Sequence, residues 1–192
     1  MNHIHFDDDT WGMNKNFVHD LCKGIRTECP GMRWSCELVV KLAKAPFLKQ
    51  MSDAGCTYIQ IGVESGNNEM LKKIKKSCTL EEAIAAGKLI LKYDIGLLAF
   101  FMIGHPEETE ETLNDTINAM KNFDCDIAFS IFTPYPGTEA FELCKKMGVI
   151  GDDYNVSLYN HQSPANNFCP QISAERFREL AIKTSKAVDR RN

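Results

Sequence analysis

The sequence lacks a hydrophobic run long enough to cross a membrane, and it lacks a signal for secretion. A membrane-spanning helix needs about 20 consecutive apolar residues, and no run in these 192 residues approaches that length. The N-terminus, MNHIHFDDDTWG, has aspartates where a secretory signal has a basic region followed by an apolar one. The content of 44% apolar and 25% charged residues is typical of soluble globular domains. We therefore expect a soluble, cytoplasmic protein with no membrane partner.

Closely spaced cysteines are also missing, although the chain has eight cysteines. No two are closer than seven residues, so the motifs CxxC and CxxxCxxC and the zinc-knuckle spacing do not occur. A fold stapled by disulfides does not fit a chain of this length without an export signal. We expect reduced, mostly buried thiols and assign no metal ligand in this chain.

An excess of positive charge is absent too. The net charge of -4 and the pI of about 5.7 argue against a general nucleic-acid-binding surface. One local basic run, Lys72, Lys73, Lys75 and Lys76, is typical of a solvated helix face.

Short apolar runs alternate with amphipathic stretches, a pattern that predicts parallel strands joined by helices and hence an α/β fold. Thr79 and Glu82, for example, form a capping box at the start of one helix. Five β/α units are too few for an eight-stranded barrel but can form most of a smaller open one. We expect the barrel in residues 1–150 and an extension with one helix in residues 151–192. The expected strands cover residues 4–6, 32–38, 58–63, 97–103 and 126–132.

Distinctive polar residues follow the expected strands. Ligands of parallel α/β folds bind at the C-terminal ends of the strands, so residues on this shared rim are candidates for a binding site. Each also has a local explanation, since Asp8 and Asp9 could cap a helix, Glu108 could belong to the first turn of a helix, and His105 could be a solvated loop residue. The candidates are Asp7, Asp8, Asp9, Thr10, Glu64, Ser65, His105, Glu107, Glu108, Thr133, Tyr135 and Thr138.

Several motifs resemble, in order, the core of the radical S-adenosylmethionine (SAM) enzymes. They are Asp8-Asp9-Thr10, Trp34-Ser35-Cys36, Ala54-Gly55-Cys56, Ile61-Gly62-Val63-Glu64-Ser65-Gly66, Lys75, Gly104-His105-Pro106-Glu107-Glu108-Thr109 and Thr133-Pro134-Tyr135-Pro136-Gly137-Thr138. The resemblance extends from about Ile4 to about Val149 and is strongest to the branch that is often fused to a cobalamin-binding domain. Motifs such as GVESG and GxPxET are weak alone, but together and in order they are specific.

This resemblance implies an incomplete (β/α)6 TIM-like barrel with a C-terminal helical extension. In the family a 4Fe-4S cluster transfers one electron to SAM, and the resulting 5'-deoxyadenosyl radical takes a hydrogen atom from the substrate. The complete enzyme would be an oxidoreductase or a transferase that uses SAM and the cluster, with cobalamin as a further option. Its substrate and its catalytic residues cannot be assigned from the sequence.

The resemblance also implies positions for SAM. Asp8, Asp9 and Thr10 correspond to the segment that meets the methionine amino group, and Glu64 and Ser65 to the strand end that faces the ribose and methionine. Gly104 and Pro106 correspond to the loop beside adenine, where a small, stiff backbone permits close approach. Tyr135 corresponds to the rim of the last strand, near adenine or substrate.

Three departures from the family pattern stand out. The family's CxxxCxxC loop follows the first barrel strand and would precede Met1, so we expect this chain alone to bind no cluster. Val39-Val40-Lys41 stands where relatives have an arginine and an acid, which removes an anchor for the SAM carboxylate. Glu107 replaces a usual glycine.

Two alternatives to a fragment of a radical SAM enzyme remain open. One is a degenerate half-barrel without a cluster that binds a nucleotide or a partner protein. The other is a TIM-barrel hydrolase in which Asp7, Asp8 and Asp9 supply oxygen ligands to a hard cation. Since no strand precedes Ile4-His5-Phe6 in this sequence, we also expect an exposed sheet edge that pairs two copies into a homo-oligomer.

Overall fold

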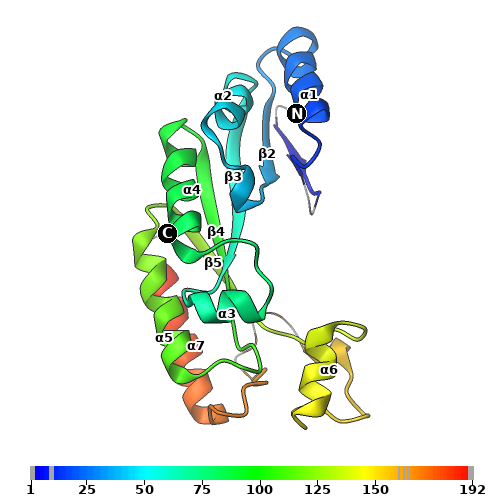
Figure 1. Cartoon of the computed structure of the whole chain (residues 1–192), viewed down its shortest axis with the longest axis vertical. Helices are drawn as coiled ribbons and strands as arrows, with labels where there is room; N and C mark the ends of the chain where they lie inside the picture. The colour runs from blue at the N-terminus through cyan, green and yellow to red at the C-terminus, as the bar shows by residue number, and fades with distance from the viewer. Residues whose placement is uncertain (1–2, 9–10, 160, 162, 164, 190–192) are drawn as a thin grey trace. The chain divides into compact units, whose positions relative to one another are not determined.

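The computed structural model describes residues 3–8, 11–159, 161, 163 and 165–189 (Figure 1). The chain forms two compact units. The first unit comprises residues 1–63, 77–100 and 122–127, and the second comprises residues 64–76, 101–121 and 128–192. The expected boundary between residues 150 and 151 stays a prediction.

Five strands form one open sheet in the order β1-β2-β3-β4-β5. Parallel pairing joins β1 to β2 and β2 to β3. The sheet is not closed into a barrel within the described residues, which confirms the expected open α/β fold with parallel strands. The strands are β1 (His3–Phe6), β2 (Arg33–Glu37), β3 (Cys56–Glu64), β4 (Gly96–Ile103) and β5 (Asp126–Ile131).

Helices follow each strand, with one addition to the expected set. The first unit contains α1 (Lys15–Glu28), η1 (Val40–Leu42), α2 (Ala45–Asp53) and α4 (Leu80–Lys92). The second contains α3 (Asn68–Lys73), α5 (Glu110–Ala119), α6 (Glu139–Lys146), η3 (Val156–Leu158) and α7 (Ala174–Asp189), and η2 (Met120–Asn122) follows α5. The sequence pattern indicates only a helix face at the basic run and gives no bounds for α3, because its six residues are too few to show a 3.6-residue period.

The first unit is built around a buried tryptophan. The Trp34 ring is fully buried, and its Nε1 donates a 2.9 Å hydrogen bond to the carbonyl oxygen of Ala54. Trp11 and Phe6 pack against this ring at centroid distances of 5.2 and 5.5 Å. The capping box at Thr79 forms as expected and fixes the start of α4.

The second unit has its core between α5, α7 and two strand ends. Helices α5 and α7 pack together and lie side by side in Figure 1. Phe177 of α7 is fully buried with Leu113 of α5, Ile103 of β4 and Ile131 of β5. Thr109 caps α5, so its acidic first turn meets the positive end of the helix dipole.

The eight cysteines are free thiols, six of them buried, as the sequence indicates. In the described ranges, no helix combines the length and apolar character needed to span a bilayer.

Candidate functional site

The second unit contains a cavity of about 580 Å³, a volume typical of sites for small ligands. Its walls come from the C-terminal ends of β3 and β4, the residues after β5, the segment after α3, and α6. This is the side of a parallel sheet at which ligands bind. The lining residues are Glu64, Lys73, Ile74, Lys75, Lys76, Met102, His105, Glu107, Phe132, Glu139, Ala140 and Leu143.

Three lysines of the cavity wall are each paired with a glutamate. Lys76 Nζ lies 2.9 Å from Glu64 Oε1, and both side chains are about three-quarters buried, at 27% and 25% exposure. Lys73 contacts Glu107 at 3.4 Å, and Lys75 pairs with the more exposed Glu139. The wall therefore presents both ammonium and carboxylate groups. The Lys76–Glu64 pair contributes most, because solvent screens the other two pairs more strongly.

Two of these charged residues have a left-handed backbone. Glu64 has φ 71° and Lys75 has φ 57°, a conformation that costs a non-glycine residue roughly 1 kcal/mol or more. Glu64 adopts it directly at the end of β3, where the chain turns away from the sheet. Such residues cluster at ligand sites, and both of these line the same cavity.

The loop from Gly104 to Glu108 forms part of the wall and is held by a buried carboxyl group. Glu108 is only 2% exposed, and its Oε2 accepts a 2.6 Å hydrogen bond from the Gly104 N–H. Burial raises the pKa of Glu108 to about 7, against the opposing effect of the hydrogen bonds from the backbone of Gly104 and His105. Cys169 holds the same loop by donating its Sγ–H to the His105 carbonyl oxygen at 3.1 Å.

His105 projects into the cavity from this loop. Its ring lies edge-on to Phe132 with a centroid distance of 5.2 Å, and burial lowers its pKa. The imidazole is therefore neutral at pH 7. Its Nδ1 accepts a long 3.4 Å contact from the Glu107 N–H, which leaves Nε2–H as a hydrogen-bond donor for a ligand.

Of the predicted SAM contacts, Glu64 lines the cavity directly. Gly104 and Pro106 do not line it themselves but belong to the loop whose residues His105 and Glu107 do. Ser65 is buried, and its hydroxyl bonds to Thr116 Oγ1 at 3.2 Å and accepts from the Asn67 N–H, so it stabilises the turn after β3.

Tyr135 lies outside the cavity lining. Its hydroxyl pairs with His161 Nε2 at 2.8 Å, and the residue is 45% exposed. Asp8 belongs to the first unit, where its carbonyl oxygen accepts from the Trp11 N–H, while Asp9 and Thr10 lie outside the described residues.

Sequence reasoning missed the lysines and Glu139. The prediction that the basic run lies on a solvent-exposed helix face is correct for Lys72, which pairs with Glu69 on the surface. Lys73, Lys75 and Lys76 instead line the cavity because α3 ends at Lys73 and the chain then turns through the left-handed Lys75. The only sequence signal that could have placed a lysine at the site was the position of Lys75 among the family motifs.

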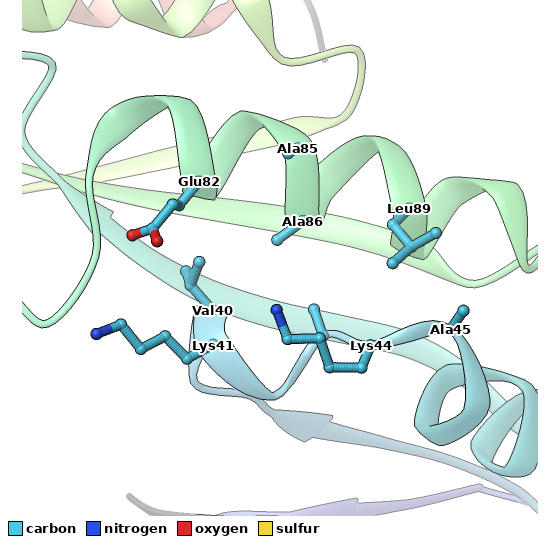
Figure 2. A pocket seen from close by; sticks show the side chains of 9 residues that line it. Val40, Lys41, Lys44, Ala45, Glu82, Ala85, Ala86 and Leu89 are labelled. Atoms are coloured by element: carbon cyan, nitrogen blue, oxygen red, sulfur yellow. The ribbon is translucent and has the colours of Figure 1, made fainter.

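A second cavity in the first unit is smaller, at about 230 Å³. Figure 2 shows it between α4, which contributes Ala85, Ala86 and Leu89, and the segment from η1 to α2. Glu82 at the edge of this cavity already accepts a hydrogen bond from the backbone N–H of Thr79 in the capping box. This volume falls below the range of about 300–1,000 Å³ that is typical of ligand sites, so the cavity of the second unit is the candidate site.

The residues of this chain do not fit a 4Fe-4S cluster. A cluster with one open iron needs three cysteine thiolates that converge. Among the described residues, no three cysteines come together closely enough to share a metal centre, and burial raises the pKa of Cys22 and of Cys144 to about 11, which disfavours the thiolate.

The cavity does fit SAM. Its carboxylates and lysines suit the charged methionine part, and Phe132, Met102 and Ile74 suit a flat, apolar adenine ring.

Comparison with known proteins identifies the family. The family model described as the Radical SAM superfamily matches residues 14–120. The chain belongs to the radical SAM superfamily. It is 36% identical over 140 residues to an uncharacterized methyltransferase of Pyrococcus horikoshii, covering 72% of this chain and 30% of that protein. It is 34% identical over 139 residues to the tRNA-2-methylthio-N(6)-dimethylallyladenosine synthase of Buchnera aphidicola, covering 71% of this chain and 31% of that protein.

A solved radical SAM structure shares the fold. The radical SAM methyltransferase TsrM of Kitasatospora setae, whose structure holds cobalamin and a [4Fe-4S] cluster, superposes with a TM-score of 0.72 at 16% identity. The match covers 98% of this chain and 43% of TsrM. This chain thus spans less than half of TsrM and about a third of the curated relatives that it matches.

Proposed function

We propose that the cavity of the second unit binds SAM and that the complete protein cleaves it as a radical SAM enzyme. Family membership and the mixed charged and apolar wall support this proposal. When bound in such enzymes, a 4Fe-4S cluster supplies the electron that cleaves SAM. The residues of this chain hold the cosubstrate, and the cluster ligands belong to a further segment of the complete protein.

The wall residues take separate roles in this proposal. The ring of Phe132 contacts adenine, while the left-handed Gly104, φ 94°, packs its missing side-chain face against Phe177 and so sets the path of the loop that carries His105. Glu64 and Lys76 contact the polar ribose and methionine groups, and their ion pair opens to receive them. His105, neutral and donating from Nε2, orients the ligand without adding positive charge beside the sulfonium.

The relatives favour a transferase over an oxidoreductase. The matched proteins include methyltransferases and a methylthio-group synthase, so we propose that the complete protein transfers a one-carbon or methylthio group. Cobalamin is proposed as a further cofactor of the complete protein, on the likeness to TsrM.

Binding of radiolabelled SAM to this chain, measured by equilibrium dialysis, tests the cavity assignment. Ala140 lines the cavity from α6, so Ala140→Phe fills it and should weaken SAM binding by a factor of at least about 10, which is about 1.4 kcal/mol. The matched control, Ala85→Phe, fills the cavity of Figure 2 and should leave binding unchanged. Equal loss in both folded variants, or no saturable binding to the parent chain, would contradict the assignment.

A cluster-free binding domain is the second candidate, because the charged and apolar wall of the cavity would also suit a nucleotide. In that case ATP or adenosine should compete with SAM and bind with similar affinity, because a nucleotide-binding domain does not need to recognise the methionine part. Competition by S-adenosylhomocysteine but not by adenosine would support the enzyme.

We also propose that two copies of this chain pair through β1. In the sheet of the described residues, β1 has a neighbour on one side only, and Ile4 on this strand is 44% exposed. An exposed edge with an apolar residue invites pairing with another strand. Light scattering should show concentration-dependent dimers that Ile4→Lys abolishes, and a strictly monomeric chain at high concentration would refute the proposal.

A further inference from the structure

Three side chains of metal-ligating type lie together in the first unit. They are His5 of β1, Asp7 just after β1, and Glu37 at the end of β2. One ligand atom from each lies within 4.8 Å of the other two. No other three His, Cys, Asp or Glu side chains in the described ranges meet this condition.

The strand register explains why these residues meet. β1 and β2 are parallel with His5 opposite Ser35 and Phe6 opposite Cys36. Because side chains alternate along a strand, His5 and Asp7 share a face with Ser35 and Glu37. The same register, continued by one residue, sets Asp7 opposite Glu37. Phe6 and Trp34 pack edge-on, at an interplanar angle of 84°, and fix the strands relative to each other.

No lysine or arginine of the described part of the chain offsets the two carboxylates. Neither Asp7 nor Glu37 forms an ion pair with a lysine or arginine among the described residues. Like charges directly opposite each other on neighbouring strands are destabilising. A bound divalent cation would relieve this repulsion.

Ser35 orients the histidine. Ser35 is a buried residue, at 5% exposure, and its Oγ lies 2.8 Å from His5 Nδ1 and 2.9 Å from His3 Nε2. Ligating histidines are commonly held through the ring nitrogen that does not bind the metal. With Nδ1 bonded to Ser35, Nε2 of His5 is the nitrogen available for a metal.

We propose that His5, Asp7 and Glu37 bind one divalent transition-metal ion and that Ser35 positions His5. One imidazole and two carboxylates suit Zn²⁺, Mn²⁺, Fe²⁺ or Co²⁺ better than Mg²⁺ or Ca²⁺, which prefer all-oxygen ligands. Three protein ligands leave coordination positions open to water or to a ligand. The site uses no cysteine and shares no residue with the proposed SAM cavity.

Titration of the untagged chain with Co²⁺ under reducing, metal-free conditions tests the site. We expect one ion per chain, with visible d–d bands and without the intense near-ultraviolet charge transfer that thiolate ligands produce. Quenching of tryptophan fluorescence should follow the same curve, since Trp34 adjoins Ser35 in sequence and Trp11 packs against Trp34. Thiolate charge transfer, or the lack of a saturable stoichiometric phase, would overturn the proposal.

Matched variants separate this site from adventitious binding. His5→Ala and Glu37→Gln should each weaken Co²⁺ binding by a factor of at least about 10, and Ser35→Ala by roughly 10- to 100-fold. His19→Ala and Asp20→Asn, two exposed α1 residues, should leave binding unchanged. In the metal-free chain, Glu37→Gln should also raise the urea midpoint by removing the repulsion. Equal losses in the α1 variants, or an unaltered Glu37→Gln affinity, would overturn the proposal.

Discussion

Replacing Glu108 with glutamine should change how the stability of the chain depends on pH. The carboxyl group is 2% exposed, and its pKa in the folded chain is about 7 instead of the ordinary 4.5. The folded chain therefore binds this proton more tightly than the unfolded chain does. Its contribution to stability is complete below about pH 4.5 and is lost as the pH rises to about 7.

The magnitude follows from the two pKa values. Their difference, at about 1.36 kcal/mol per pKa unit, corresponds to a loss of about 3 kcal/mol in the free energy of unfolding between about pH 4.5 and pH 7. Glutamine keeps an oxygen that can accept the 2.6 Å hydrogen bond from Gly104, but it does not ionise. The stability of Glu108→Gln relative to the parent chain should therefore rise with pH by about 3 kcal/mol.

Urea unfolding followed by circular dichroism from pH 5 to pH 8 measures this difference. The readout is the pH slope of the difference, which is unaffected by any pH-independent cost of burying the glutamine amide. The pKa of His105 is lowered, so this residue destabilises the fold as the pH falls. Both proteins contain His105, so its contribution cancels in the difference between their stabilities. Glu69→Gln, which alters the exposed ion pair with Lys72, is the control and should retain the parent slope. A Glu108→Gln slope equal to that of the parent would refute the reasoning.

The remaining predictions concern backbone geometry, capping and thiol accessibility. Gly104→Ala should cost about 1–3 kcal/mol of unfolding free energy, because a Cβ at φ 94° would lie 2.9 Å from Phe177 Cζ; Gly137→Ala, at φ 86° in open space, should cost only about 1 kcal/mol. Thr79→Ala removes the cap of α4 and should cost about 1 kcal/mol, again measured by urea unfolding. Iodoacetamide should label Cys29 well before the six buried thiols, as followed by mass spectrometry; equal labelling rates in the native chain would contradict the burial pattern.

Local sequence signals predicted much of the fold. The box at Thr79 caps α4 as predicted, because its side chain bonds to a backbone N–H three residues away and needs no tertiary context. The nearly all-apolar run that forms β4 predicts a strand covered by other parts of the chain. The open sheet followed from the count of β/α units, because too few were present to close a barrel.

Side-chain pairing across the fold was harder to predict. Lys75 and Glu139 are 64 residues apart in sequence, so their pairing depends on how the turn after α3 meets α6. Glu108 was expected on the ligand-binding rim or in a helix first turn, yet it reaches back to the Gly104 N–H before α5 begins. Ser65 and Tyr135 carried family motif signals, but their hydroxyls bond to Thr116 and His161. A motif specifies where a residue lies along the chain, whereas tertiary packing decides what its side chain contacts.

The central claim is that this chain belongs to an enzyme that cleaves SAM, and one measurement tests it most directly. The complete reading frame that contains this chain should be expressed, reconstituted anaerobically with iron and sulfide, reduced, and incubated with SAM. The account predicts an in-frame CxxxCxxC segment upstream of Met1 and formation of 5'-deoxyadenosine or of a SAM-derived methyl product. A complete reading frame with no such motif, together with intact SAM after reduction, would contradict it.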